Sequence, residues 1–135
     1  MHTSFLAILA ASLPLLSTAA TIGAETHFYG DAGCTAFLSN AEAYYNQAPY
    51  VGGTNGGEGA GCIALNPPGN AVSANTAAIF EANGSTETAG FCLFYDGYAC
   101  DGIEDISHYT PGKGDCLPAR SSAGYLWKSA QCYVA

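Results

Sequence analysis

The stretch HFYGDAGCT, which begins at His27, matches a second stretch, LFYDGYACD, which begins at Leu93. Each contains a Phe-Tyr pair, and each places a cysteine five residues after the tyrosine, at Cys34 and Cys100. The features that follow also come in the same order: a loop, a second cysteine, a turn, a hydroxyl residue and a last β-like run. These ordered matches at similar spacing indicate that one structural unit occurs twice.

The two predicted units span about residues 25–82 and 90–135 and differ mainly in one loop. The first unit carries about a dozen extra residues there, including the glycine tract VGGTNGGEGAG. Its hydroxyl residue is taken to be Thr76, the counterpart of Ser129. At about 115 residues, the segment 21–135 has the length of a single domain.

The amino-terminal segment 1–20 has the pattern of a secretory signal peptide. Its apolar run, Phe5–Leu16, is followed by small residues that end at Ala20. The run is shorter than the ~20 apolar residues that a membrane-spanning helix needs. We therefore expect a secreted, extracellular protein without a membrane span.

The net charge argues against two classes of partner. The chain has 11 acidic and 3 basic residues and a formal net charge of −8. Binding to nucleic acid or to anionic lipid requires a basic surface. We therefore expect neither.

The six cysteines predict disulfides. An even number behind a signal peptide is typical of a disulfide framework. A metal site is not expected, because the chain has no C-x-x-C motif and no histidine at ligand spacing from a cysteine pair. Aligning the two units predicts one bridge within each, Cys34–Cys62 and Cys100–Cys116.

The remaining cysteines, Cys92 and Cys132, are predicted to form the third bridge. Their counterparts in the first unit are taken to be Thr26 and Ile79. Both cysteines are present in one unit and both are absent from the other, which is expected of residues that are neighbours in space.

The local pattern predicts an all-β fold, with many short strands and frequent turn signals. The predicted strands are Thr26–Asp31, Gly61–Leu65, Ala77–Ala82, Phe91–Asp96, Cys116–Ala119, Tyr125–Lys128 and Ala130–Val134. The only helix candidate is Ala36–Gln47, in which Ala, Glu and Leu favour a helix. We therefore expect a small disulfide-bonded β-sandwich of two Greek-key-like units, with that one short helix.

The stretches FCLFYDGYACDG and GDCLPARSSAGYLWKSAQCYV resemble the βγ-crystallin Greek-key domain, and more closely the fungal small secreted cysteine-rich proteins. The resemblance implies an effector-like, toxin-like or antimicrobial function and supplies no catalytic residues. Its calcium motif is not matched. The stretch SANT, from Ser73, offers one Asn, and YLWKS, from Tyr125, has a lysine where an oxygen ligand is needed. No cofactor is expected.

Enzymatic function is an alternative that the sequence supports weakly. Neither His27 nor His108 lies near Arg120, the one arginine, and the chain lacks a G-x-S-x-G motif. A small ribonuclease and a glycan hydrolase remain open as alternatives, the second because acidic residues cluster in sequence. These residues are Asp96, Asp101, Glu104, Asp105 and Asp115.

The interpretation that we favour is a non-enzymatic recognition protein with an extracellular protein or a cell-wall glycan as its target; a carbohydrate-binding module is the main alternative. We expect the binding surface to include Tyr125 and Trp127, together with the loop between Cys34 and Cys62. Further exposed aromatic candidates are Tyr44, Tyr45, Tyr50, Tyr98 and Tyr109. The sequon that starts at Asn83 predicts N-glycosylation.

Overall fold

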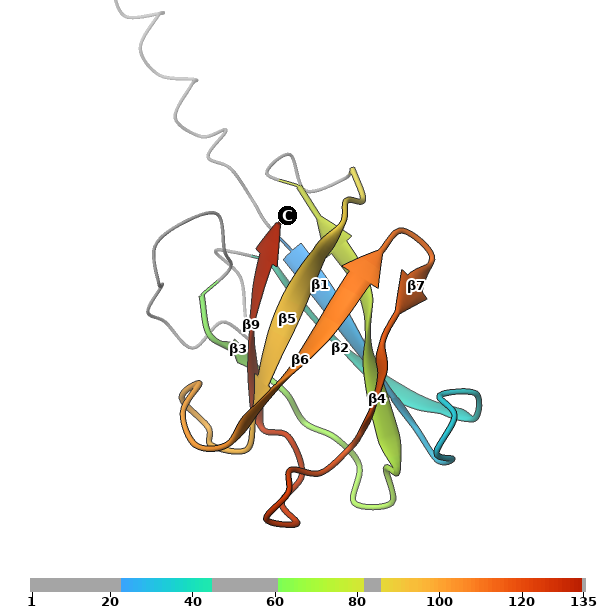
Figure 1. Ribbon diagram of the computed structural model, residues 1–135, viewed down its shortest axis with the longest axis vertical. Helices are drawn as coiled ribbons and strands as arrows, with labels where there is room; N and C mark the ends of the chain where they lie inside the picture. Colours follow the sequence, from blue (N-terminus) through green and yellow to red (C-terminus); the bar gives the residue numbers. More distant parts are fainter. Residues whose placement is uncertain (1–22, 45–60, 82–85, 135) are drawn as a thin grey trace, which may run out of the picture.

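Two antiparallel β-sheets pack face to face in a computed structural model, which describes residues 23–44, 61–81 and 86–134 (Figure 1). One sheet has the strand order β2-β1-β4-β8, and the other has the order β3-β9-β5-β6-β7. The strands are β1 (Gly23–Tyr29), β2 (Phe37–Tyr44), β3 (Ile63–Ala64), β4 (Ser73–Phe80), β5 (Gly90–Tyr95), β6 (Glu104–Thr110), β7 (Lys113–Gly114), β8 (Cys116–Pro118) and β9 (Ser129–Val134). The expected disulfide-bonded β-sandwich is confirmed.

The predicted helix at Ala36–Gln47 is wrong. Its described part forms β2, which pairs with β1 along the whole strand, from Gly23 opposite Tyr44 to Tyr29 opposite Phe37. Cross-strand pairing has overridden the helix preference of Ala, Glu and Leu, as tertiary context commonly does. No helix occurs in the three described segments.

The two repeat units exchange a strand. The first unit places β1, β2 and β4 in one sheet, and the second places β5, β6 and β9 in the other. The short third strand of each unit leaves its own sheet: β3 pairs with β9, and β8 pairs with β4. Each sheet is therefore completed by a strand from the other unit.

A serine at the start of the fourth strand shows how the units correspond. The Ser73 hydroxyl accepts a hydrogen bond from the backbone N–H of Cys34 at 3.2 Å, and Ser129 does the same for Cys100 at 2.9 Å. Both cysteines adopt the left-handed conformation, with φ of 57° and 55°. Ser73, not Thr76, is therefore the counterpart of Ser129, and the sequence alignment was wrong by three residues.

The disulfides cross between the units. The bridges are Cys34–Cys116 and Cys62–Cys100, so the predicted pairs Cys34–Cys62 and Cys100–Cys116 are wrong. Strand exchange explains the difference. Cys116 is carried by β8 into the first unit's sheet, and Cys62 precedes β3, which lies in the second unit's sheet. Each first cysteine therefore meets the second cysteine of the other unit.

The third predicted bridge, Cys92–Cys132, is confirmed. The two cysteines lie directly opposite each other on β5 and β9 and are fully buried. In the first unit Thr26 and Thr76 lie opposite each other on β1 and β4, and both are buried. The counterpart of Cys132 is therefore Thr76, and the earlier assignment to Ile79 was wrong.

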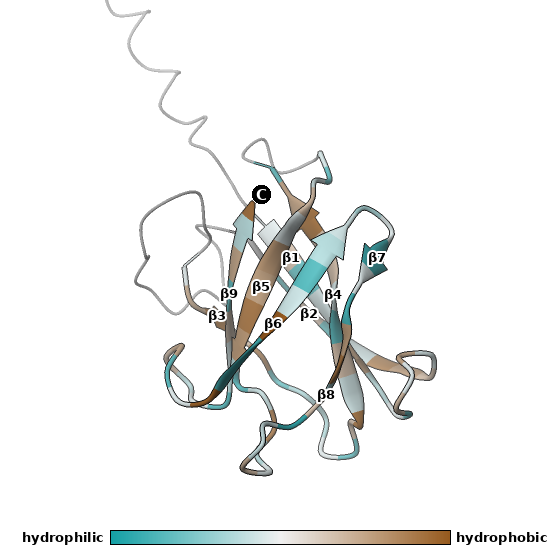
Figure 2. Ribbon diagram, in the orientation of Figure 1, coloured by the Kyte–Doolittle hydropathy of each residue, from teal (hydrophilic) through white to brown (hydrophobic). Residues whose placement is uncertain are grey.

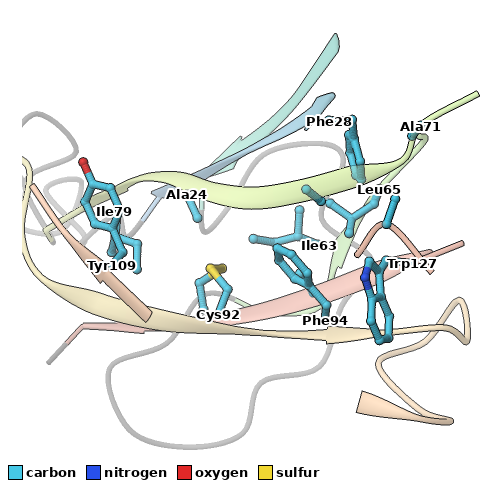
Figure 3. Packing of buried hydrophobic residues seen from close by; sticks show 14 residues of the cluster. Ala24, Phe28, Ile63, Leu65, Ala71, Ile79, Cys92, Phe94, Tyr109 and Trp127 are labelled. Atoms are coloured by element: carbon cyan, nitrogen blue, oxygen red, sulfur yellow. A yellow bond between two sulfur atoms is a disulfide. The ribbon is translucent and has the colours of Figure 1, made fainter. Parts of the chain in front are cut away.

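One apolar core fills the space between the sheets (Figure 3). Phe28 on β1 and Phe94 on β5 occupy equivalent places and are both buried, as the repeat predicted. Phe94 packs against Trp127, with the ring centroids 6.2 Å apart. Burial of these large side chains supplies the main stabilisation of the sandwich.

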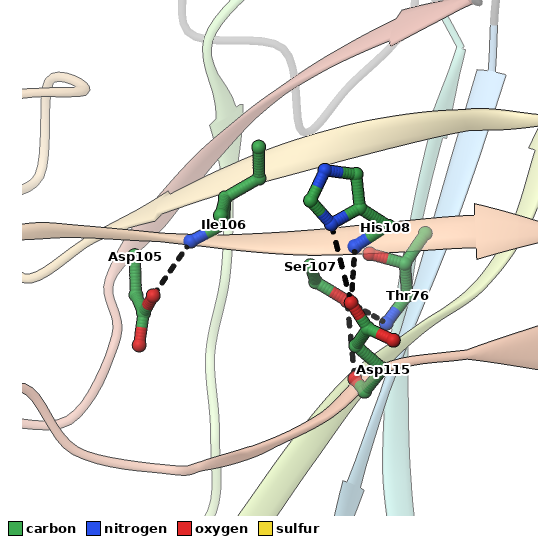
Figure 4. A network of polar contacts seen from close by, with 6 residues as sticks. All are labelled: Thr76, Asp105, Ile106, Ser107, His108 and Asp115. Carbon is green, nitrogen blue, oxygen red and sulfur yellow. Dashed lines mark hydrogen bonds and ion pairs between the residues drawn. The ribbon is translucent and has the colours of Figure 1, made fainter.

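The hydropathy of the strands follows this packing. Apolar residues run along β5, whereas β6 is polar over much of its length (Figure 2). On β6 only Ser107 and Tyr109 are buried. The Ser107 hydroxyl accepts from the backbone N–H of Thr76 and donates to the carbonyl of Asp115, both at 3.2 Å (Figure 4). It thereby links β4 of one sheet to β6 of the other.

Candidate recognition site

Two exposed tyrosines flank one lysine in the second unit. Tyr98 lies between β5 and β6 and is 74% exposed, and Tyr125 lies before β9 and is 60% exposed. The Lys128 ammonium lies 5.5 Å from the ring centroid of Tyr98 and 5.2 Å from that of Tyr125. Both distances are within cation–π range. The lysine thus joins two loops that are distant in sequence.

These residues form the wall of a hollow of about 460 Å³. Ile103, which is also exposed, lies at the same hollow. We call the group Tyr98, Ile103, Tyr125 and Lys128 the tyrosine surface.

A second hollow, of about 470 Å³, adjoins the tyrosine surface because Ile103 lines both. Its polar lining includes Glu104, Asp105 and Arg120, and we call it the arginine hollow. The Arg120 guanidinium donates to the carbonyls of Gly124 at 3.0 Å and Gly69 at 3.3 Å, which fixes its position.

Hydrogen bonds hold the loops of the tyrosine surface in place. The pKa of Asp96 is lowered, chiefly by a hydrogen bond from the Ser121 side chain and further by the Ile103 amide and by Lys128, against a smaller opposing effect of burial. The Ile103 N–H donates to the Asp96 carboxylate at 2.9 Å, and Lys128 donates to the Asp96 carbonyl at 3.2 Å. One residue therefore connects both loops.

A disulfide fixes the loop that carries Tyr98. Cys100 ends the turn after β5 and is bonded to Cys62, which precedes β3 of the same sheet. A loop on such a covalent scaffold loses little conformational freedom when it binds a partner.

In its described residues, the first unit has no equivalent surface. The backbone N–H of Val72 donates to the Tyr29 carbonyl at 2.7 Å, as that of Lys128 does to Tyr95 at 2.8 Å, so Val72 is the counterpart of Lys128. Tyr98 follows Tyr95 by three positions and corresponds to Ala32. Tyr125 precedes Lys128 by three and corresponds to Gly69. The first unit thus has Ala, Gly and Val where the second has Tyr, Tyr and Lys.

The two residues predicted to bind a partner lie in different environments. Tyr125 is exposed as described above, whereas Trp127 is only 2% exposed. The indole N–H of Trp127 donates to the Pro118 carbonyl at 2.7 Å, and its ring lines the arginine hollow. Trp127 is therefore part of the core and of the wall of that hollow.

The other aromatic candidates separate in the same way. Tyr98 is exposed, and Tyr109 is buried. Several predicted sites lie outside the described residues: the side chain of Tyr44, the residues Tyr45, Tyr50 and Asn83, and most of the loop between Cys34 and Cys62. Sequence reasoning did not connect Tyr98 with Lys128, because they come from separate loops.

His27 belongs to a polar chain on the outer face of β1 that the sequence analysis missed. Its Nε2 lies 2.9 Å from the Glu25 carboxylate, and its Nδ1 lies 3.4 Å from the Tyr29 hydroxyl. The Tyr29 hydroxyl also donates to Asn75 at 3.3 Å, and burial raises its pKa. The signal was the alternation of Glu25, His27 and Tyr29, which places all three on one face of a strand.

His108 makes a separate pair. Its Nδ1 lies 3.2 Å from the Asp115 carboxylate, which also accepts from the backbone N–H of His108 at 3.2 Å (Figure 4). Both side chains are exposed. Together with Lys113 they line a hollow of about 220 Å³.

The acidic cluster of the sequence does not form one site. Asp96 closes the loop under the tyrosine surface, Glu104 and Asp105 line the arginine hollow, and Asp115 pairs with His108. Among the residues that the structure describes, no group of three or more His, Cys, Asp or Glu side chains is arranged to hold a metal ion.

No protein-family model, no curated protein and no solved structure matches this chain. Within the described residues, no helix is long and apolar enough to cross a membrane.

Proposed function

We propose that this protein is a secreted, non-enzymatic recognition protein, effector-like or toxin-like, that binds an extracellular partner through the tyrosine surface. The observation that carries the proposal is the placement of Tyr98 and Tyr125 on either side of Lys128. Exposed tyrosines offer a large amphipathic contact area at low entropic cost, which is why they are enriched in binding sites. Three disulfides support an extracellular location.

The internal repeat strengthens the proposal. The two units share their backbone frame but not these side chains, so the frame does not require exposed tyrosines at these positions. The exposed tyrosines are therefore not explained by the fold and are available for a task of the second unit. The crossed bridge at Cys100 then keeps the surface in its binding conformation.

The two histidines lie on different strands and do not form one acid–base pair. A general base needs a ring nitrogen that faces the substrate. Both ring nitrogens of His27 are engaged, by Glu25 and by Tyr29. His108 has Asp115 on one nitrogen, and both of these side chains are exposed to solvent. His108 lies on β6, whereas His27 lies on β1.

The decisive experiment removes both tyrosine rings and the lysine ammonium of the tyrosine surface. The variant combines Tyr98→Ala, Tyr125→Ala and Lys128→Val. Fluorescently labelled protein is applied to plant tissue and to fungal hyphae, and bound protein is measured by titration. We expect the apparent affinity to fall more than ~10-fold, which corresponds to about 1.4 kcal/mol of binding free energy.

The matched control is Phe37→Ala, which removes an aromatic ring that is 56% exposed on β2 of the first unit. It should bind as the wild type does. Equal binding by the triple variant and the wild type would exclude the tyrosine surface. If His108→Ala instead abolished cleavage of RNA or of a glycan in a folded protein, the enzymatic alternative would replace this proposal.

A further inference from the structure

We infer that the tyrosine surface and the arginine hollow form one continuous site for an uncharged oligosaccharide chain. The inference rests on the proposed function and names its ligand class. The two hollows share Ile103 as a lining residue, so they are adjacent, and a chain that lies on the tyrosines needs to pass only this side chain to reach the arginine hollow.

The size of the site favours a small or narrow ligand. Hollows of about 460 and 470 Å³ fall within the ~300–1,000 Å³ typical of small-molecule sites. A stable protein partner would instead require ~800 Å² of complementary surface on this chain. A narrow chain that occupies both hollows in succession fits these dimensions.

The charges that line the site are nearly balanced. The combined lining holds two cations, Lys128 and Arg120, and three carboxylates, Asp96, Glu104 and Asp105. A polyanion would meet the carboxylates, and a polycation would meet the lysine and the arginine. A ligand without charge avoids like-charge repulsion from either set of side chains. It can still form hydrogen bonds with the cationic donors and the carboxylate acceptors of the lining.

The side chains supply the two kinds of contact that a sugar ring uses. The apolar C–H face of a pyranose packs on an aromatic ring, and Tyr98 and Tyr125 present such rings to solvent. Sugar hydroxyls both donate and accept hydrogen bonds. Glu104 and Asp105 accept them, and N–H groups of Arg120 other than those bonded to carbonyls donate them.

Trp127 provides a direct readout of occupancy. It is the only tryptophan of the chain and lines the arginine hollow, so a sugar that enters the hollow changes the surroundings of the indole. The oxidised protein is titrated with tetrasaccharides of glucose, mannose, xylose and N-acetylglucosamine. The charged comparisons are a tetramer of galacturonic acid and one of glucosamine.

We expect at least one uncharged tetrasaccharide to shift the Trp127 emission, and neither charged one to do so. Binding should be little changed between about 50 and about 500 mM NaCl, because no net ion pairing is involved. Tyr98→Ala and Tyr125→Ala should each weaken it ~10-fold, and Tyr98→Phe, which keeps the ring, less than ~3-fold. Glu104→Ala, which removes a hydrogen-bond acceptor from the arginine hollow, should also weaken binding of the tetrasaccharide.

Two outcomes would overturn the inference without touching the proposed function. In the first, no uncharged sugar binds while the triple variant still loses cell-surface binding, and protease treatment of the cells removes that binding; the partner is then a protein. In the second, only a charged sugar binds. If a sugar binds equally well to wild type and to the triple variant, the tyrosine surface is not the sugar site and this inference fails; the proposed function fails only if the triple variant also keeps its binding to the cell surface.

Discussion

The two units of this protein share their backbone frame but differ in their outer surfaces. On the outer face of β1 the alternating residues are Glu25, His27 and Tyr29, joined in a polar chain. At the same positions of β5 stand Phe91, Leu93 and Tyr95, and Phe91 stacks on Tyr133 with centroids 5.1 Å apart. The inward-facing phenylalanines and the strand-opening serines are the same in both.

The difference shows which positions the fold requires. Residues that face the other sheet, or that bond the turn to the fourth strand, are repeated because the packing and the turn depend on them. Residues that face solvent are free to diverge. The tyrosine surface is the clearest divergence at the loop end, and the next three predictions test how far the shared frame extends.

The largest effect is expected from removing a bridge between the units. The double substitution Cys34→Ser and Cys116→Ser opens a connection between cysteines 82 positions apart in sequence. The free energy of unfolding, measured by urea denaturation, should fall by ~4 kcal/mol on the chain-entropy model. A fall below ~1 kcal/mol would mean that this bridge does not constrain the two units. Non-reducing peptide mapping of the wild type provides the control, because it must recover Cys34 joined to Cys116.

A second prediction transfers the bridge of one sheet to the other. Thr26 and Thr76 face each other as Cys92 and Cys132 do, so Thr26→Cys with Thr76→Cys should form a fourth disulfide. We expect a gain of ~1–2 kcal/mol in unfolding free energy, at the lower end for added bridges. Two titratable thiols in the folded, air-oxidised variant would show that positions 26 and 76 are not placed as Cys92 and Cys132 are in the other sheet.

Thr76→Val is the control for this design. The Thr76 hydroxyl is buried and has no hydrogen-bond partner among the described residues. Its removal should leave stability unchanged or slightly raised, since an unsatisfied buried hydroxyl is unfavourable. A stabilised double-cysteine variant must exceed this baseline before the gain is assigned to the bridge.

The smallest effect concerns the turn after β1, which Asp31 closes. Hydrogen bonds from the Ala36 amide, the Thr35 hydroxyl and the Thr35 amide lower the pKa of Asp31 from 3.8 to about 2. Because the folded pKa is the lower one, the stabilisation is complete above pH 3.8 and is lost as the pH falls toward about 2.

We therefore expect Asp31→Asn to flatten the pH dependence of thermal unfolding between pH 4 and 2. Thr35→Val, which removes one of the three hydrogen bonds, should give an intermediate profile. An unchanged slope in Asp31→Asn would show that the carboxylate does not hold the turn. The turn of the second unit is closed differently, by Asp96, and should be unaffected.

Much of the fold was readable from the sequence, because the repeat marks the same strands twice. The repeat predicted the strands that carry Phe28 and Phe94, and the short strands at Cys62 and Cys116. It also predicted the Cys92–Cys132 bridge. β6 was missed because only Ser107 and Tyr109 face inward, so its apolar alternation is weak. Tyr125–Lys128 was predicted to be a strand but contains only an isolated bridge, between Leu126 and Arg120.

The strand exchange and the site could not be predicted from local patterns. The stretches at Cys62 and Cys116 specify short strands but not their partners, because pairing is set by the tertiary fold. The same limit applies to the candidate site. Tyr125 was identified as a binding residue, yet its contact with Lys128 and the proximity of Tyr98 depend on how two loops meet.

The crossed bridges have a consequence for how the chain matures. During synthesis Cys34 and Cys62 emerge first, and neither has its native partner until Cys100 and then Cys116 have been made. The pair available at that stage, Cys34 with Cys62, is the non-native one. Correct oxidation therefore has to wait for the second unit or to undo an earlier bond by thiol exchange. The first unit cannot be completed alone, because Cys116, which closes its bridge to Cys34, belongs to the second unit and is made later.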